Sequence, residues 1–420
     1  MNHKFVGYKC SLCDAEYNPD EVIYTCRIDG GNLDIIYDYS TLHRDLSSET
    51  ITSSLKESLW RYLPLLPVQE PQSIDTPLHA AGWTPNFAPP ALRQQLGLPF
   101  LWIKDESRNP TASFKDRASA VVVARAQELD VQVVVTASTG NAGAALAGMA
   151  AAVGQRAVIF APRTAPPAKI AQLLIYDAQV LLVDGNYDQA FDLSILAANE
   201  FGWYCRNTGY NPFTLEGKKT AALEIWECVL NQRSLNTPLA VFVSVGDGNI
   251  ISGLHKGFKD LQALGWLDHM PRIFGIQAEG SAAITNAFLA GVEEITPVSA
   301  STVADSICVD LPRDGVRAVR AARQSGGAYL TVSDAGILAA LSALGRVGIF
   351  SEPAGATAYA GFLKAIEQGI VTPEDAILVL NTGSGLKDVD AAMKAVQPAP
   401  IIEPTLAAVE KELNGIDLSQ

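Results

Sequence analysis

From about residue 76 onward, short apolar runs alternate with longer amphipathic segments. This alternation predicts an α/β fold with parallel sheets, because strands separated by helices usually pair in parallel. Right-handed crossovers place helices on both faces of such sheets, and ligands bind at the carboxyl ends of the strands. The expected strands are residues 131–136, 157–161, 179–183, 239–245, 273–278 and 376–380. Helices are expected from the Gly/Ala-rich segment 137–148 and from Ala168, Asp188 and Ile250.

The overall composition limits the classes of protein that fit. Of 420 residues, 48% are hydrophobic and 18% charged, which is typical of a folded enzyme with two or three domains. A formal net charge of −14 argues against nucleic-acid binding, which needs clustered lysine and arginine. No apolar run reaches about 18 residues, so no membrane span is expected. Because the first residues lack the apolar core of a signal peptide and the six cysteines suggest no disulfide framework, we expect a cytoplasmic protein.

One lysine lies where a short polar turn becomes a helix. Residues 109–119 read NPTASFKDRAS, which places Lys115 directly before an apolar helical run. A lysine is electrostatically unfavourable there, because a helix N-terminus carries partial positive charge. It is either a solvated surface residue or a partly desolvated amine that can be neutral and nucleophilic.

Two further turns suit anions. ASTGNAGAALAG (137–148) follows an expected strand and exposes backbone N–H groups at a helix N-terminus, which suits a carboxylate or phosphate. VSVGDGNIISG (243–253) has the spacing G-x-G-x4-G, so a phosphate fits it better than a dinucleotide. An ordinary capped strand-to-helix turn remains the alternative for the first, and the glycine-rich pattern of the second is a weak signal alone.

The segment LNTGSGLKD (380–388) follows the last expected strand. Thr382 could reach a ring nitrogen with its hydroxyl, although a strand-ending turn with a side-chain cap would look the same. Taken together, the four turns supply a nucleophilic amine, an anion turn, a phosphate cradle and a hydroxyl for a heterocycle. These are the requirements of pyridoxal phosphate, whose aldehyde forms a Schiff base with a lysine.

Several motifs make the chain resemble the threonine synthase family, within the pyridoxal phosphate enzymes of the tryptophan-synthase-β fold type, or fold type II. NPTASFKDR is similar to the family's NPTGSFKDR element. The other similar segments are SLWRYLPLLP (58–67), DTPLH (75–79), LWIKDES (101–107), NPFTLEGKKT (211–220), EPAGAT (352–357) and LNTGSGLKD.

The resemblance implies two α/β domains with twisted, largely parallel sheets flanked by helices, plus a small zinc-ribbon-like N-terminal ribbon. The expected boundaries are 1–40 for the ribbon, 41–117 with 213–395 for the large cofactor domain, 118–212 for the small domain, and 396–420 for a linker and terminal helix. Within residues 8–39, the segments 22–24 and 33–37 are expected to form the ribbon strands.

The resemblance also implies a role for each turn. Lys115 would bind the cofactor aldehyde, Asn141 would bond its ring oxygen, and Thr382 would face its pyridine nitrogen. Ser138, Thr139 and Asn141 would take the substrate carboxylate. The cofactor phosphate would be cradled by Gly246, Asp247, Gly248, Asn249 and Ile250.

The implied reaction converts O-phospho-L-homoserine and water to L-threonine and phosphate, with Lys115 as general acid and base. Lys104 and Arg117 are candidates to bind the leaving phosphate, although Arg117 could instead form a surface salt bridge. A rival reading is another pyridoxal phosphate lyase, eliminating or replacing a β-substituent on a different amino acid. A second rival is a non-catalytic protein that binds a partner through the ribbon. A homodimer is expected for either enzyme.

Three departures from the family pattern bear on these expectations. Thr214 and Gly209 stand where the family has a phosphate-binding arginine and a small hydroxyl residue, so Lys218 or Lys219 would have to compensate. The GDGNI loop is shorter than expected, and Asp247 would be unfavourable beside a phosphate. In the ribbon, Cys10, Cys13 and Cys26 are joined by Asp29 where a fourth cysteine would complete a zinc site. Because structural zinc sites favour sulfur and nitrogen ligands, these four residues favour a ribbon that keeps its shape without metal, with bound zinc as the alternative.

Overall fold

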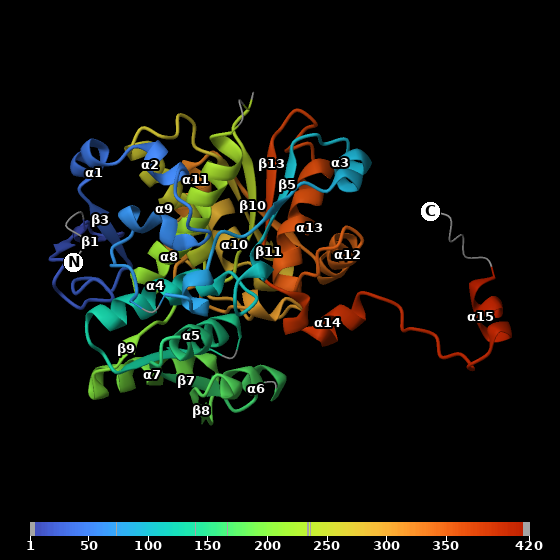
Figure 1. Cartoon of the computed structure of the whole chain (residues 1–420), viewed down its shortest axis with the longest axis horizontal. Coiled ribbons are helices and arrows are strands. Elements are labelled where there is room, and N and C mark those ends of the chain that lie inside the picture. Colours follow the sequence, from blue (N-terminus) through green and yellow to red (C-terminus); the bar gives the residue numbers. More distant parts are fainter. Residues whose placement is uncertain are drawn as a thin grey trace.

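The computed structural model describes residues 5–72, 74–138, 140–165, 167–232, 235 and 237–414. The body contains two sheets, one above the other, and both consist mainly or entirely of parallel strands. The small N-terminal ribbon lies against the side of the larger sheet (Figure 1). The larger sheet has six strands in the order β12-β11-β10-β13-β5-β4, and all neighbours are parallel except β4 and β5. Its strands are β4 (Asn86–Phe87), β5 (Leu101–Asp105), β10 (Ala240–Ser244), β11 (Arg272–Ala278), β12 (Tyr329–Val332) and β13 (Ile377–Asn381).

The smaller sheet has four parallel strands in the order β8-β7-β6-β9. They are β6 (Val133–Ala137), β7 (Arg156–Pro162), β8 (Gln179–Val183) and β9 (Tyr204–Cys205). Alternate residues of these strands face opposite sides, as pleating requires. Val134 packs in the cluster that contains Leu146 of α5, whereas Val135 packs in the cluster that contains Phe191 of α7. The predicted α/β fold with helices on both faces is therefore confirmed.

The helices of the smaller sheet are α5 (Asn141–Ala151), α6 (Pro167–Ile175) and α7 (Tyr187–Phe201). Helix α13 (Pro353–Glu367) packs on one face of the larger sheet, where its Phe362 meets Phe242 of β10 edge to face, with ring centroids 5.5 Å apart. The opposite face carries α9 (Asn249–Ala263) and α11 (Gly315–Gln324). Helices α4 (Lys115–Glu128) and α8 (Phe213–Ile225) pack together, and α8 also packs on α9.

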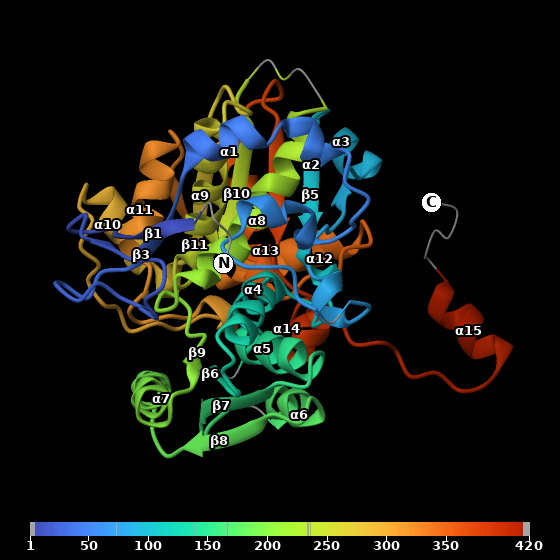
Figure 2. The same ribbon diagram turned by 60° about the vertical axis from the view of Figure 1, so that its left-hand side comes forward.

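Most of the remaining elements lie outside the cavity described below, but Asp305–Ile307 contributes to its lining. The helices are α1 (Tyr39–Asp45), α2 (Ser48–Thr52), α3 (Pro90–Leu96), α10 (Ala283–Leu289), α12 (Asp334–Gly345), α14 (Val389–Lys394) and α15 (Leu406–Leu413). Short 3₁₀ helices run over Leu59–Leu65, Pro77–Ala80, Glu106–Arg108, Glu279–Ser281, Asp305–Ile307 and Gly385–Lys387, and a π-helical segment, Trp226–Leu230, follows α8. Helix α15 has no buried residue and lies away from the body in both views (Figures 1 and 2). Within the described part of the chain, no helix is long and apolar enough to cross a membrane.

The N-terminal ribbon is an antiparallel sheet in the order β2-β1-β3. Its strands are β1 (Phe5–Cys10), β2 (Glu16–Tyr17) and β3 (Leu33–Tyr37). The predicted strand at 33–37 is confirmed, but the one at 22–24 is wrong. The Tyr24 ring stacks on Tyr210 of the body, with centroids 4.7 Å apart, and its hydroxyl accepts from the Cys205 N–H at 3.1 Å. The apolar alternation at 22–24 thus docks the ribbon rather than pairing a strand.

The observed bounds of six strands agree closely with the predicted ones. The strand predicted at 179–183 is β8 itself, and the other five differ by one or two residues at their ends. Strands β4, β5, β9 and β12 were not predicted. The domain boundaries given above stay a prediction, although β6–β9 and β10–β13 do belong to separate sheets.

Candidate active site

A cavity of about 370 Å³ opens at the carboxyl ends of β6, β10 and β13, between the two sheets. Parallel sheets place ligands there because the loops after neighbouring strands converge at that edge. The structure brings the predicted residues of all four turns to this cavity. Its lining includes Lys115, Ser138, Asn141, Gly246, Asp247, Gly248, Asn249, Ile250, Thr382 and Lys218. Thr139 lies outside the described residues.

The lysine turn is held against the end of β13. The Phe114 N–H donates to the Thr382 carbonyl at 2.9 Å, and the Ser384 N–H donates to the Ala112 carbonyl at 3.1 Å. Helix α4 then begins at Lys115 itself. Ala112 has a φ of 63°, in the left-handed region that favours glycine. The family element has glycine at this position, so the tight turn is kept here at the cost of strain.

The Lys115 amine has the properties of a nucleophile. Among the described residues, no hydrogen bond or ion pair engages its Nζ. Burial lowers the pKa of Lys115 below its ordinary 10.5, and the nearby Arg206 acts in the same direction. Glu352 and Asp247 oppose that shift. The environment therefore increases the neutral fraction of the amine.

Glu352 is a site residue that sequence reasoning did not assign. It immediately precedes α13, is only 3% exposed, and lines the cavity. Burial raises its pKa, whereas the Asn141 hydrogen bond and the Lys115 charge act to lower it. The quoted EPAGAT segment contained this carboxylate. A charged residue at the start of an otherwise apolar helix was the available signal.

The loop from Gly246 to Ile250 leads from β10 into α9. Gly248 has a φ of 90°, and a Cβ there would lie 2.7 Å from the Asp314 carbonyl, so glycine is required for the loop to pack on α11. The loop and the first turn of α9 present backbone N–H groups and the positive end of the helix dipole. The Asp247 side chain is partly turned aside, since its Oδ1 accepts from the Arg313 N–H at 3.3 Å.

Asn249 organises the polar groups beside this loop. Its Oδ1 accepts from Lys218 Nζ at 2.6 Å, and its Nδ2 donates to Asp314 Oδ2 at 2.7 Å. Thr214 Oγ1 is also 3.3 Å from the same Asn249 oxygen. Burial lowers the pKa of Lys218 well below its ordinary value, with Arg206 and Lys115 adding to the effect. The position that lacks the expected arginine therefore lies beside Lys218.

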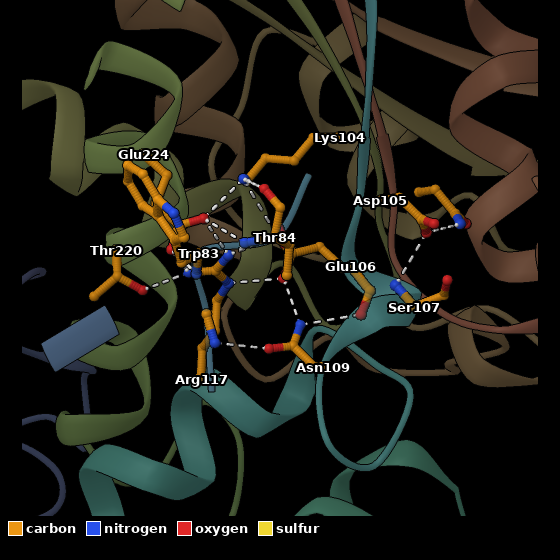
Figure 3. A network of polar contacts seen from close by, with 12 residues as sticks. Trp83, Thr84, Lys104, Asp105, Glu106, Ser107, Asn109, Arg117, Thr220 and Glu224 are labelled. Atoms are coloured by element: carbon orange, nitrogen blue, oxygen red, sulfur yellow. Dashed lines mark hydrogen bonds and ion pairs between the residues drawn. The ribbon is translucent and has the colours of Figure 1, made fainter. Parts of the chain in front are cut away.

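The structure places Lys104 and Arg117 elsewhere. Both are fully buried in a network with Glu106 and Glu224, between β5, α4 and α8 (Figure 3). Lys104 Nζ lies 2.7 Å from Glu224 Oε2, and Arg117 Nε lies 2.7 Å from Glu106 Oε2. Burial alone would raise the pKa of Glu224, but Arg117 and Lys104 hold it at about 2. Neither cation lines the cavity, and the ion pairs of Arg117 are buried rather than at the surface.

Lys219 also points away from the cavity, although it follows Lys218 directly. Its Nζ lies 2.5 Å from Glu216 and 2.8 Å from Asp260, both buried. Consecutive residues of a helix project about 100° apart, so only one of the two lysines can face the site. Lys218 is the lysine that lines the cavity.

Arg206 is a second residue that the sequence did not single out. It follows β9, is fully buried, and donates from Nη1 to Thr208 Oγ1 at 2.6 Å and from Nε to Ser119 Oγ at 3.3 Å. Its Nη2 has no hydrogen-bond partner among the residues that the structure describes. Burial lowers the pKa of Arg206 to about 10. Thr208 lines the cavity, so a cation with spare donor capacity lies beside it.

The polar groups of the cavity fit pyridoxal phosphate. The buried Ser244 hydroxyl at the end of β10 and the Lys115 amine both line the cavity, and neither has a hydrogen-bond partner in the described part of the chain. Lys115 would hold the aldehyde, and the Gly246–Ile250 loop would hold the phosphate. Orphaned polar groups inside a cavity of this size indicate a place for a polar ligand.

The four candidate metal ligands of the ribbon come together. One ligand atom from each of Cys10, Cys13, Cys26 and Asp29 lies within 4.8 Å of all the others. The sulfurs of Cys13 and Cys26 are 3.6 Å apart, and a backbone N–H of Leu12 points at the Cys10 sulfur at 3.3 Å. This cluster could hold a metal ion.

Comparison with known proteins identifies the class. Residues 78–383 match the family model described as pyridoxal-phosphate dependent enzyme, so the chain belongs to that family. By fold alone, it is similar to the processed form of threonine deaminase isoform 2 from Solanum lycopersicum, at 24% identity and a TM-score of 0.64, covering 82% of this chain and 94% of that one. It is also similar in fold to diaminopropionate ammonia lyase from Escherichia coli, at 20% identity and a TM-score of 0.65, covering 77% and 89% of the two chains.

Curated relatives then narrow the assignment within that class. The chain is 39% identical to threonine synthase from Methanocaldococcus jannaschii, covering 97% of this chain and 99% of the relative. It is 37% identical to threonine synthase from Methanosarcina acetivorans, covering 97% and 98%. The chain belongs to the threonine synthase family, as its motifs predicted.

Proposed function

We propose that this enzyme converts O-phospho-L-homoserine and water to L-threonine and phosphate. The observation that carries the proposal is the content of one cavity: an unengaged lysine amine, an anion-binding loop and a second cationic group, Lys218. A lyase that acts on an unphosphorylated amino acid needs the first two but has no use for the third. The two relatives that match nearly the whole chain are both threonine synthases, and this supports the same reaction.

Bound pyridoxal phosphate would supply an aldehyde for the amines of enzyme and substrate and a ring that stabilises negative charge developing beside Cα. Lys115 Nζ would take the proton from Cα and later a proton from Cβ, and would return protons as the reaction closes. The bond between Cγ and the phosphate oxygen breaks, and water adds its oxygen at Cβ. One lysine can serve all these steps because the proton transfers occur on the side of the substrate that its amine faces.

The substrate phosphate would be bound by Lys218 and Arg206 rather than by an arginine at position 214. A phosphate dianion beside Lys218 would favour its charged form and reverse the effect of burial on its pKa. Arg206 would add the fork of donors that a lysine lacks. Lys104, Arg117 and Lys219 are engaged with buried carboxylates and are left out of this assignment.

The substrate carboxylate would be bound at the N-terminus of α5. The Ser138 side chain caps this turn, since its Oγ accepts from the Gly140 N–H at 3.1 Å. Asn141 begins the helix and lines the cavity. Thr139, between them, is proposed on the sequence motif alone. Thr382, at the end of β13, would face the ring nitrogen of the cofactor.

The test is to add O-phospho-L-homoserine to the cofactor-loaded protein and to measure inorganic phosphate and threonine in one tube. Equal amounts of both support the proposal. Ammonia released from serine or threonine, without turnover of the phosphorylated substrate, would identify the rival lyase. The visible spectrum of the loaded protein shows independently whether the cofactor site is intact.

For the ribbon, we propose a structural zinc ion held by Cys10, Cys13, Cys26 and Asp29. Tetrahedral coordination with Zn–S bonds of about 2.3 Å places sulfurs about 3.8 Å apart, close to the Cys13–Cys26 separation. Metal analysis of protein purified without chelator should give one zinc per chain, and its absence would favour a metal-free ribbon. A cytoplasmic location and a homodimer likewise remain proposals from composition and fold.

A further inference from the structure

A second cavity of about 320 Å³ lies between the ribbon and the body. The ribbon contributes β1, the turn after it and β3, and the body contributes α8, α9 and α11. Its cationic or potentially cationic lining residues are Lys9, His255, Lys256, Lys259, Arg317 and Arg320, against the carboxylates of Asp14 and Asp34. The chain as a whole has a formal net charge of −14, so the lining of this cavity has the opposite sign of charge.

Ion pairs within the protein account for only part of this charge. Arg317 Nη1 lies 2.8 Å from Asp34, and Arg320 Nη2 lies 2.6 Å from Glu293. Lys256 Nζ lies 3.0 Å from Asp260, and Lys9 Nζ lies 3.2 Å from Asp14. Lys259 has no ion pair with any residue that the structure describes. Lys259 is exposed, so its charge is available to a ligand in the cavity that it lines.

His255 gives an independent indication of a ligand. It is only 7% exposed and lines the cavity, yet no hydrogen bond from its ring connects it to the described residues. The ring nitrogens of His255 are not among the fully buried polar atoms that lack a partner, so they are accessible from the cavity and can bond a ligand there. Burial lowers the pKa of His255 to about 4, with Lys259 acting in the same direction and Asp34 against it. An anion bound here would lie beside the charge of Lys259 and would act to raise the pKa of His255.

We propose that this ribbon cavity binds a small molecule carrying a phosphate or diphosphate group, with His255, Lys259 and Arg317 as its principal contacts. Phosphate fits better than a carboxylate because several donors converge from different elements. Lys259 and His255 lie one helical turn apart on α9, and Arg317 comes from α11. The site is separate from the substrate phosphate position, which involves Lys218.

The two cavities share a chain of polar contacts. Arg317 Nε donates to Asp314 Oδ1 at 2.5 Å, and Asp314 Oδ2 accepts from Asn249 Nδ2 at 2.7 Å. Asn249 in turn accepts from Lys218. An anion that attracts Arg317 would compete with Asp314 for it. A ligand in the ribbon cavity is therefore placed to alter the position of Asn249 in the active-site cavity.

The test observes His255 directly in the full-length, cofactor-loaded protein. The chain has five histidines, so a spectrum of protein labelled with ¹³C in the histidine rings is simple, and His255→Gln assigns the signal by removing it. Inorganic pyrophosphate, without divalent cations, is the probe. The His255 signal should shift saturably. Lys259→Ala should weaken pyrophosphate binding roughly tenfold or more, as loss of a charged contact does. Lys259→Arg should bind nearly as well.

Lys411→Ala is the matched control, because it removes the same charge from the exposed helix α15 and should leave the titration unchanged. A His255 signal that does not move would overturn the proposal. So would a shift that persists in Lys259→Ala but disappears in Lys218→Met, since pyrophosphate would then be bound in the active-site cavity. Both readouts concern binding alone, so they are independent of which reaction the enzyme catalyses.

Discussion

The side-chain amide of Asn141 donates to both carboxylate oxygens of Glu352, at 2.7 and 3.0 Å. Asn141 begins a helix of the smaller sheet, and Glu352 precedes a helix of the larger one. This buried contact joins the two halves of the molecule across the cavity that contains Lys115. The pKa of Lys115 is raised by the Glu352 carboxylate and lowered by Arg206.

We predict that Glu352→Gln and Arg206→Met shift the pH dependence of the enzyme in opposite directions. Glu352 raises the pKa of Lys115 and Arg206 lowers it. Removing the carboxylate should lower this pKa further and move the rate profile to lower pH, whereas removing the guanidinium should move it to higher pH. The measurement is the pH dependence of initial rate and of cofactor absorbance. Shifts of the same sign in both variants would contradict the assignment.

We predict that the adjacent residues Lys218 and Lys219 differ sharply in function. Lys218→Met should raise KM for the phosphorylated substrate roughly ten- to a hundredfold, as expected for loss of a charged phosphate contact, with little loss of stability. Lys219→Met leaves Glu216 and Asp260 less compensated, so it should lower the free energy of unfolding by about 3 kcal/mol. The KM of the folded Lys219 variant should be unchanged. An unchanged KM in Lys218→Met would sink the phosphate assignment.

Much of the fold could be predicted because it depends on local patterns. Strand β8 (Gln179–Val183) is bounded by turn residues and is apolar at every position after Gln179, and it was located to the residue. β12 (Tyr329–Val332) has only four residues and pairs with a strand about fifty positions earlier, so no local signal marked it. The error at 22–24 has the same origin, because apolar alternation shows that side chains are buried but not what buries them.

The sequence predicted only those site residues that belong to its motifs. The turns that carry Lys115, Asn141 and Thr382 converge because parallel strands end at one edge of a sheet. Lys104 and Arg117 also lie in segments that resemble the family, but they pair with Glu224, more than a hundred positions away. Such pairing leaves no local trace. Arg206 was missed because it lies in none of the motifs and the strand before it, β9, has only two residues.

We predict that Glu224 is structural. It binds Arg117 and Lys104 and also accepts from the Trp83 N–H at 2.7 Å, all in the interior. Glu224→Gln should lower the free energy of unfolding by about 3–5 kcal/mol, because it breaks a buried network. The exposed Glu279→Gln is the control and should change stability little.

The effect of Glu224 should also depend on pH. Its folded-state pKa is lowered to about 2, below the ordinary 4.5, so its contribution is present above about pH 4.5 and is lost as pH falls through 2. Chemical denaturation across this range should show the gap between wild type and Glu224→Gln closing with acidification. A gap that is constant or widens would refute the network as described.

We predict that Ala112→Gly stabilises the protein. The φ of 63° costs an alanine roughly 1 kcal/mol or more, whereas glycine adopts it freely and loses part of that gain through backbone entropy. The net increase in the free energy of unfolding should be about 0.5–1 kcal/mol. Ala118→Gly, within helix α4, is the control and should destabilise. Destabilisation at both positions would show that the turn is not strained.

The central claim is that Lys115 is the residue that binds the cofactor aldehyde. The most direct measurement is borohydride reduction of the cofactor-loaded protein, which converts the carbon–nitrogen double bond to a stable single bond, followed by peptide mass mapping. The account predicts the added pyridoxyl phosphate mass on the peptide that contains Lys115 and no such adduct in Lys115→Ala. An adduct on a different lysine, or one that persists at the same level in Lys115→Ala, would contradict it.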